Sequence, residues 1–333
     1  MTEISRRNLL AATGALAAAG LAPASLAAES QGLKGKAVFI TGTSSGFGRL
    51  GALLYARAGA RVFATMRNLP RPEAADLRQV AAHEQLDLHV LALDVRSDEQ
   101  VAAAVAEAER IHGGAMDVVV NNAGIYVAGP VELQDMEAAR LAFDTNVLGV
   151  HRVLRAVLPK MRTAGRGWIV NVSSQAGRVI MPGGGLYSAT KFALEALSEQ
   201  LAYELVPHGI EVTIIEPGGF PTNVGANRAR YNAELLARTD EDRKAAYPAL
   251  VRSMTPPPAA NPAAPRPAGL PDPIEVPNAI LELALLPAGS RPLRRPVHPS
   301  QRPQEAINAV SAETQRRLLG SGPYKDWAAA VLD

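Results

Sequence analysis

The 333-residue chain contains no cysteine, which excludes disulfides, thiolate metal sites and cysteine nucleophiles. Aromatic residues are scarce at 5%, and this argues against a protein that stacks on the bases of a nucleic acid. A strong excess of one charge is also lacking, because 34 basic residues face 32 acidic ones and the basic residues are scattered. The 6 histidines show no metal-ligand spacing. We therefore expect neither a nucleic-acid partner nor a bound metal.

Long runs without charge are confined to the N-terminus, where Arg6 and Arg7 precede an uncharged stretch that ends at residue 28. Paired arginines before a weakly hydrophobic stretch are typical of a twin-arginine export signal. Small residues at Ser25 and Ala27, or at Ala22 and Ala24, offer a cleavage site. The pattern predicts a signal peptide over residues 1–28, a periplasmic or other extracytoplasmic location, and no stable membrane span after processing. An uncleaved anchor, a disordered extension and a cytoplasmic location stay open as alternatives.

Six short apolar runs alternate with longer segments of helical spacing from residue 36 onward. The apolar runs cover residues 37–40, 62–64, 88–93, 118–120, 168–172 and 212–215, and the helical segments include 47–58, 98–111 and 189–206. Strands that are apolar on both faces and separated by helices form parallel sheets covered on both sides. This predicts an α/β protein, a Rossmann-like doubly wound parallel sheet with helices on both faces, as a single domain over residues 35–333.

The regular alternation stops after Gly218. Residues 255–273 contain eight prolines, which predicts an extended loop, and helical spacing returns at 276–286 and 304–319. We expect a segment of about 219–275 to cover the active site. Its apolar and proline-rich content favours a small or medium-sized hydrophobic ketone or secondary alcohol as substrate.

A glycine-rich loop at residues 41–48, Thr-Gly-Thr-Ser-Ser-Gly-Phe-Gly, joins the first predicted strand to the first predicted helix. Its glycines permit a tight turn, a close approach of the backbone to a pyrophosphate, and close packing of helix on strand. The free N–H groups and the dipole of the helix N-terminus would then face the phosphates. A P-loop is excluded, because no Lys-Ser/Thr pair follows the last glycine. The loop therefore predicts a dinucleotide site.

The Thr-Gly-x-x-x-Gly-x-Gly pattern resembles that of the short-chain dehydrogenase/reductase family, and further markers of this family follow in order. Asp94 and Val95 follow the third strand, Asn-Asn-Ala-Gly at 121–124 follows the fourth, and Pro-Gly at 217–218 follows the sixth. For Asp94 alone a helix cap would explain the residue, and Asn121 can also tie strands together. The resemblance implies that a nicotinamide cofactor contacts Gly42, Ser44, Ser45, Gly46, Phe47, Gly48, Arg67, Asp94, Val95, Asn121, Ala123, Gly124, Tyr187, Lys191, Pro217, Gly218, Phe220 and Thr222.

The end of the second strand bears on the choice of cofactor. An NAD enzyme places a carboxylate there to accept hydrogen bonds from the ribose hydroxyls. This chain has Met66 at that position and Arg67 after it, and the fixed donors of an arginine suit a 2′-phosphate. The sequence thus favours NADP(H) over NAD(H); a solvated surface arginine is the alternative.

Tyr187 and Lys191 lie at i and i+4 of a predicted helix, so they share one face about 6 Å apart at Cβ. A neighbouring ammonium and the positive nicotinamide ring are expected to lower the pKa of the phenol, so that it can give or take a proton. Ser174 ends a strand at the ligand-binding edge of the sheet and can donate a hydrogen bond to a substrate oxygen. Ser173 competes for this role, and the register of the resembling family selects Ser174.

Asn146 lies inside a predicted helix, in the context Asn-Val-x-Gly. The family resemblance implies that it holds a water in the proton relay from Lys191, completing a catalytic set of Asn146, Ser174, Tyr187 and Lys191. An exposed helical asparagine is the alternative.

Together the residues and the resemblance predict reversible hydride transfer between NADP(H) and a carbonyl or secondary alcohol. Sugar, steroid, retinoid and acyl substrates all remain open. A cofactor-binding redox sensor or a structural protein with vestigial chemistry is the alternative function. The resemblance also implies a homodimer or homotetramer, assembled through helices around residues 135–162 and 187–206.

Overall fold

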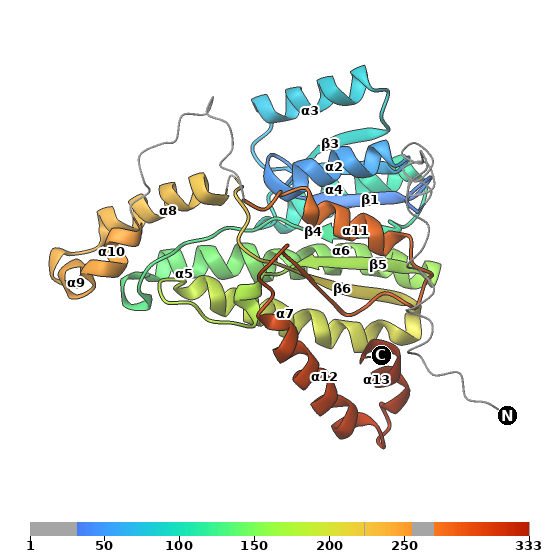
Figure 1. The fold of residues 1–333 in the computed structure, drawn as a ribbon. Coiled ribbons are helices and arrows are strands. Elements are labelled where there is room, and N and C mark those ends of the chain that lie inside the picture. Colours follow the sequence, from blue (N-terminus) through green and yellow to red (C-terminus); the bar gives the residue numbers. More distant parts are fainter. Residues whose placement is uncertain (1–31, 223, 255–269, 333) are drawn as a thin grey trace, which may run out of the picture.

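The computed structural model describes residues 32–222, 224–254 and 270–332 (Figure 1). Its centre is a parallel sheet in the order β3-β2-β1-β4-β5-β6-β7, flanked by helices on both faces. This confirms the predicted Rossmann-like doubly wound sheet. The strands are β1 (Ala37–Thr41), β2 (Arg61–Met66), β3 (Leu88–Ala92), β4 (Val118–Asn121), β5 (Gly167–Val172), β6 (Ile210–Pro217) and β7 (Arg294–Val297).

The helices follow the predicted alternation up to β6 and then depart from it. The helices are α2 (Gly46–Arg57), α3 (Pro72–His83), α4 (Asp98–His112), α5 (Met136–Phe143), α6 (Gly149–Ala164), α7 (Leu186–Leu205), α8 (Val224–Arg238), α9 (Glu241–Ala246), α10 (Pro248–Met254), α11 (Glu275–Ala284), α12 (Gln304–Leu319) and α13 (Lys325–Leu332). In the part of the chain that is described, no helix has both the length and the hydropathy needed to cross a membrane. The proposed leader over residues 1–28 lies outside this part.

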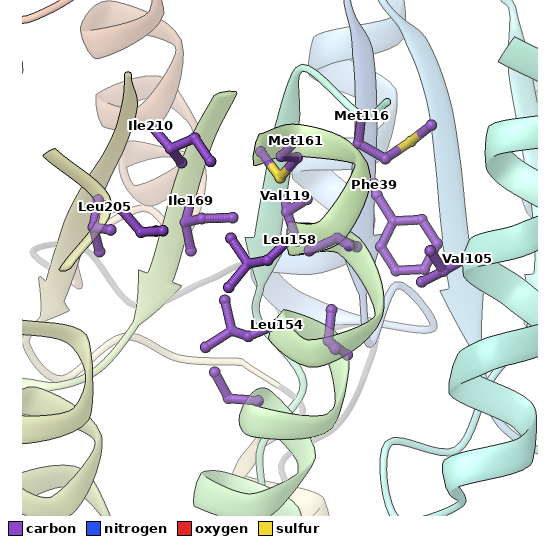
Figure 2. Close-up of a cluster of buried hydrophobic side chains, with 14 of the residues drawn as sticks. Phe39, Val105, Met116, Val119, Leu154, Leu158, Met161, Ile169, Leu205 and Ile210 are labelled. Atoms are coloured by element: carbon purple, nitrogen blue, oxygen red, sulfur yellow. The ribbon is translucent and has the colours of Figure 1, made fainter. Parts of the chain in front are cut away.

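Two apolar cores cover the two faces of the sheet, because successive strand residues point to opposite sides. Phe39 of β1 joins one core, whereas Val38 and Ile40 join the other. Figure 2 shows the first core, in which Leu154 and Leu158 lie against the sheet. Side chains buried this completely each stabilise the fold by roughly 1.5–3 kcal/mol. The cores hold the sheet rigid, so its carboxyl edge presents loops in fixed positions.

Strand β7 lies outside the six predicted strands. It pairs in parallel with β6, and Arg294 lies opposite Ile214 at the start of the ladder. The sequence Arg-Arg-Pro-Val has neither apolar continuity nor alternation, and proline is tolerated in a strand only at an edge. Burial of Arg294 beside acidic residues explains why a charged strand is stable here.

The segment predicted to cover the site contains three helices in its described part, α8 to α10, which extend from one side of the sheet (Figure 1). A third apolar cluster, which includes Ile125, Val127, Tyr231, Leu235 and Met254, holds these helices against the loop after β4. Most of the predicted proline-rich loop, residues 255–269, lies outside the described residues.

Candidate active site

A cavity of about 190 Å³ opens at the carboxyl edge of the sheet. Open α/β sheets bind ligands at this edge, where the loops after neighbouring strands converge. The loops after strands β1 to β6 form its walls, together with α7 and the first turn of α8. The predicted residues that line it are Gly42, Ser44, Ser45, Gly46, Phe47, Arg67, Asp94, Val95, Ala123, Gly124, Tyr187, Lys191 and Thr222.

The glycine-rich loop forms one wall of the cavity. Gly42 and Gly46 have φ of +75° and +56°, which favours glycine. A Cβ on Gly48 would lie 2.4 Å from the Gly42 carbonyl oxygen, so Gly48 serves the packing of α2 and does not line the cavity. Ser45 makes no side-chain cap, and the first turn of α2 carries no acid. The helix therefore offers free N–H groups and a positive dipole end to an anion.

Two neighbouring asparagines after β4 have different roles. Asn122 lines the cavity, and its Nδ2 donates to the carbonyl oxygens of Thr41 and Gly42 at 2.9 and 3.1 Å. Asn121, which was predicted to contact the cofactor, is buried beneath the cavity, where its Nδ2 donates to Asn171 Oδ1 at 2.8 Å. Asn121 thus ties β4 to β5, which was the alternative interpretation of this residue.

The predicted contacts after β6 also lie outside the cavity wall, except for Thr222. Pro217 ends β6, and a Cβ on Gly218 would lie 2.7 Å from His298 Cδ2. Phe220 packs edge-on against Phe47, with ring centroids 5.6 Å apart, and so supports the glycine loop from behind. These three residues shape the site through packing.

Arg67 and Asp94 face the cavity between β2 and β3. Arg67 is half-buried and donates to Tyr231 Oη at 3.3 Å. Asp94 is paired with Arg96 at 2.9 Å, and the pair keeps the pKa of that carboxyl lowered in spite of burial. Asp94 does not cap the next helix, because Ser97 Oγ accepts from Gln100 N. The charge of Arg67 also contributes to the lowered pKa of Asp94, but Arg67 forms no ion pair with a carboxylate among the described residues.

Tyr187, Lys191 and Ser174 converge opposite the glycine loop. Lys191 Nζ lies 5.8 Å from the centroid of the Tyr187 ring and donates to the Val172 carbonyl oxygen at 2.8 Å. Ser174 lies outside the cavity wall but its side chain hydrogen-bonds with Tyr187. Its Oγ also accepts from Ala176 N at 3.1 Å, which fixes the strand end. Ser174 and Tyr187 are thus linked by a hydrogen bond, and the Lys191 ammonium lies beside the Tyr187 ring.

Burial shifts the pKa values of Tyr187 and Lys191. Burial raises the pKa of Tyr187 to about 12, although the hydrogen bond with Ser174 opposes the rise. Burial also lowers the pKa of Lys191 to about 8, against the attraction of Glu195. In the protein alone, loss of water therefore determines the direction of the Tyr187 shift. The predicted lowering of this pKa depends also on the positive nicotinamide ring, and it stays a prediction for the protein with its cofactor. Tyr187 is a neutral phenol at neutral pH.

Asn146 lies in a π-helical segment, Asp144–Leu148, between α5 and α6. It is buried, which contradicts the alternative of an exposed helical asparagine. Its Nδ2 donates to Ile125 O at 2.9 Å and Thr190 Oγ1 at 3.0 Å, and its Oδ1 accepts from Ile125 N at 2.8 Å. Asn146 thus fixes the loop after β4 to the catalytic helix, and a Cβ on Gly124 would lie within 4 Å of both Asn146 and Lys191.

Several residues of the cavity wall escaped the sequence prediction. Tyr126 packs against Tyr187, with ring centroids 4.4 Å apart and ring planes tilted by 38°. Asn227 and Val224 come from α8. Asn122 had a signal, since it belongs to the Asn-Asn-Ala-Gly motif, whereas Tyr126 and Asn227 had none. The remaining unpredicted lining residues are Leu93, Ile125, Thr145 and Val172. Two further lining residues were named from the sequence without being chosen as contacts: Met66 at the end of β2, and Ser173, the competitor of Ser174. Among the described residues no cluster of acids and histidines could hold a metal ion.

Comparisons with known proteins agree with this architecture. The sequence profile of the short chain dehydrogenase family matches residues 36–232. The 3-ketodihydrosphingosine reductase of Bacteroides thetaiotaomicron is 38% identical over 205 residues, which cover 62% of this chain and 70% of that protein. Retinol dehydrogenase 7 of Rattus norvegicus is 42% identical over 211 residues, which cover 63% of this chain and 64% of the relative. The chain spans about two thirds of the length of these curated relatives.

A solved structure gives the same result. A short-chain dehydrogenase from Streptomyces avermitilis is 31% identical, with a TM-score of 0.63, and the match covers 86% of this chain and 98% of that one. The chain belongs to the short-chain dehydrogenase family, whose members are NAD(P)-binding oxidoreductases that act on CH–OH and C=O groups of small molecules.

Proposed function

We propose that the protein catalyses reversible hydride transfer between NADP(H) and a small molecule with a carbonyl or secondary alcohol. The observation that carries this proposal is the placement of Tyr187, with Ser174 and Lys191, across one cavity from a glycine-rich loop at a helix N-terminus. An apolar substrate is supported by Ile125 and Val224 in the cavity wall. Relatives named as a retinol dehydrogenase and a ketodihydrosphingosine reductase are consistent with this choice.

The residues at the glycine loop fit a dinucleotide. Its N–H groups and the α2 dipole suit a pyrophosphate, and Asn122 keeps the loop open by holding two of its carbonyls. In this proposal Asp94 and Val95 border the adenine, and Thr222 meets the nicotinamide amide. When bound, the cofactor supplies or accepts the hydride.

NADP(H) is favoured over NAD(H) by the end of β2. Met66 is buried there, and the half-buried Arg67 beside it has no carboxylate partner among the described residues. A guanidinium can hold a 2′-phosphate in a bidentate way. We expect Arg67→Ala to lower kcat/KM for NADPH about 10–100-fold and to leave that for NADH within about twofold. Equal losses with both cofactors would contradict this preference.

Each catalytic side chain has a defined task in the proposal. Ser174 donates a hydrogen bond to the reacting oxygen and stabilises charge that develops there. Tyr187, a neutral phenol in the protein alone, gives its proton to that oxygen during reduction. Lys191 holds a positive charge beside the phenol, and Asn146 fixes the loop after β4 against α7. The neutral phenol is the protonation state from which Tyr187 can donate a proton in the reductive direction.

Replacement of Tyr187 by Phe tests the proposal. With NADPH and a panel of ketones and aldehydes, Tyr187→Phe should lower kcat about 10²–10⁴-fold, because the proton donor is lost. The matched control, Tyr203→Phe on the same helix, should keep turnover near that of the wild type. Full turnover by Tyr187→Phe would overturn the assignment. Binding of NADPH without turnover of any panel member by the wild type would instead indicate a redox sensor.

Export by the twin-arginine route is a further part of the proposal, supported by Arg6 and Arg7 before an uncharged stretch. This route would carry the protein folded and with its cofactor bound. Fractionation of cells that express the full chain should find it outside the cytoplasm, and replacement of both arginines by Lys should retain it inside. A wild-type chain found only in the cytoplasm would refute export.

We expect the protein to assemble as a homodimer or homotetramer through α7 and the helices at residues 136–164. Phe192 supports this, since it is an exposed aromatic residue on α7. Light scattering after gel filtration should give two or four chains, and Phe192→Glu should shift the mass downward. A monomeric wild type would contradict assembly.

A further inference from the structure

Helix α8 presents a face with both apolar and polar side chains to the cavity. Val224 and Asn227 line the cavity wall. Arg228 and Tyr231 follow them at the i+4 and i+7 positions counted from Val224, so all four share one face of the helix. Tyr231 lies close to the cavity as well, because its Oη accepts from Arg67. The first turns of α8 thus bring a charged side chain, Arg228, to the mouth of the site.

The position of α8 is fixed by buried contacts. Asn232 is fully buried, and its Oδ1 accepts from Ala128 N at 3.0 Å while its Nδ2 donates to Met254 O at 3.1 Å. Leu235 packs beside it in the third apolar cluster. Because Arg228 lies one turn before Asn232, these contacts determine where its side chain emerges.

Arg228 lies over the ring next to the catalytic tyrosine. Its guanidinium carbon is 5.6 Å from the centroid of the Tyr126 ring. The centroids of the Tyr126 and Tyr187 rings are 4.4 Å apart. Arg228 is therefore no more than about 10 Å from the Tyr187 ring, a bound set by these two contacts. A small substrate that reaches Tyr187 with one end can reach Arg228 with the other.

The charge of Arg228 is not neutralised by any described residue. Two other arginines of α8 have acidic partners: Arg230 pairs with Glu234 at 3.1 Å, and Arg238 pairs with Asp135 at 2.9 Å. In the described part of the chain, the contact of Arg228 with Tyr126 is its one recorded interaction. A guanidinium against an aromatic face keeps its N–H edges free for a planar anion.

We propose that Arg228 binds a carboxylate of the substrate, so that the protein reduces oxo acids with a few carbons between the carbonyl and the acid group. This rests on the proposed function and adds a carboxylate to one end of its otherwise apolar substrate. The carboxylate would lie against Arg228 and Tyr126, and the carbonyl would lie at Tyr187 and Ser174. Apolar wall residues such as Ile125 and Val224 would contact the carbon chain.

The experiment compares acids with their neutral esters. The probes are 3-, 4- and 5-oxohexanoate and the methyl ester of each, with NADPH as reductant. For the wild type, kcat/KM for the best acid should exceed that for its ester about tenfold or more, since a hydrogen bond to a charged group contributes a corresponding free energy. Arg228→Leu should remove this preference by lowering the value for the acid about 10–100-fold, with the ester within about twofold. Arg228→Lys should keep part of the preference.

Arg230→Leu is the matched control, because Arg230 lies on the same helix but is paired with Glu234 and packs on Tyr231, not on Tyr126. This variant should leave kcat/KM for the acids and for the esters unchanged. Equal kcat/KM values for acid and ester, unchanged in Arg228→Leu, would overturn the inference about the carboxylate. Reduction of the esters would in that case still support the proposed function. A KM for NADPH that rises in Arg228→Leu with both probes would also overturn it, since the arginine would then serve a cofactor phosphate.

A binding measurement covers the case in which no probe is reduced and the proposed function fails. Thermal unfolding is followed for protein saturated with NADP⁺, with and without 4-oxohexanoate or its ester. Stabilisation by the acid alone, lost in Arg228→Leu, would support the carboxylate site. Equal shifts with acid and ester, or an unchanged acid shift in Arg228→Leu, would reject it.

Discussion

Lys191 of helix α7 and Arg294 of strand β7, which contacts Glu195 and Glu199 on the same helix, are both buried cations, yet their surroundings differ. Lys191 Nζ donates to a neutral acceptor, the Val172 carbonyl, and burial lowers its pKa to about 8. Arg294 lies between three acids, with Glu195 at 2.9 Å, Glu216 at 3.7 Å and Glu199 in direct contact, and its pKa is raised despite burial. The first cation can change charge near neutral pH, whereas the second is permanently charged.

This difference separates chemistry from stability on one helix. A cation without an acidic partner has a destabilised charge that a bound anion or phenolate can use. A cation within a group of acids is neutralised, and its removal leaves buried negative charge behind. Glu195 belongs to both regions, because it bonds Arg294 and also attracts Lys191. We therefore expect substitutions at the two cations to have opposite effects on activity and stability.

Lys191→Met should show the largest effect on activity. We expect kcat to fall about 10²–10⁴-fold, because the charge that assists the tyrosine is lost. The free energy of unfolding should not fall by more than about 1 kcal/mol, since methionine has a similar volume and no charge to desolvate. Steady-state assays with NADPH and urea unfolding measure the two effects. A loss of stability as large as that expected for Arg294→Met would show that Lys191 is mainly structural. The two cations would then not differ in role.

Arg294→Met should give the largest loss of stability. Removing one partner from a buried ionic group costs about 3–5 kcal/mol, because Glu195 and Glu199 stay buried without their cation. The midpoint of urea unfolding should fall in proportion. Any remaining folded protein should retain cofactor binding, as the cavity wall is formed by other residues. A loss below about 1 kcal/mol would indicate that the acids are already neutral in the folded protein.

Glu216→Gln tests the charge state of the acids around Arg294. Burial and the proximity of Glu195 raise the pKa of Glu216 from 4.5 to about 8. A raised carboxyl pKa gives a stabilising contribution that is complete below the unfolded pKa and is lost as pH rises through 8. The free energy of unfolding of the wild type should thus decrease between about pH 5 and pH 8, and the variant should show a weaker decrease. Parallel pH profiles would place the titration elsewhere.

Arg295→Ala should have the smallest effect. Arg295 follows Arg294 in strand β7, and its guanidinium lies 2.8 Å from the carboxylate of Glu282 at the surface. The side chain of Glu282 is 63% exposed. Exposed pairs contribute about 0–1 kcal/mol. The urea midpoint should hardly change, which makes this variant the control for Arg294→Met. A loss comparable with that of Arg294→Met would mean that strand β7 itself, and not the buried group, is sensitive to substitution.

Much of the fold could be predicted because its signals are local. Apolar runs such as 118–120 are buried on both faces of a parallel sheet, so hydropathy alone identifies them. The strand β7 could not be found this way, since Arg294 is stabilised by acids that come from distant parts of the sequence. Helices α8 to α10 lay in a segment predicted only as a cover, because their positions depend on cluster contacts with residues 125–128.

Site residues could be predicted where a sequence motif determines the backbone conformation. Prediction was poorer where the direction of a side chain determines whether it lines the cavity. Tyr187 and Lys191 follow from helical spacing, and both line the cavity. Asn121 has the right position in sequence, but it points to Asn171 below the cavity. Tyr126 and Arg228 carry no pattern of their own, since a loop and a helix from separate segments bring them together.

The π-helical segment Asp144–Leu148 has a consequence for how this helix could be altered. A wide turn of this kind holds one residue more than a regular turn, so it is equivalent to a single-residue insertion in a continuous helix. Because each residue of an α-helix turns the chain by about 100°, the extra residue is absorbed without rotating α6 against the core. Deleting the exposed Leu148 would therefore restore a uniform helix whose flanks keep their phase, while Asn146 would turn away from Ile125. The helix would gain regular hydrogen bonds, and the protein would lose the link between the loop after β4 and its catalytic helix.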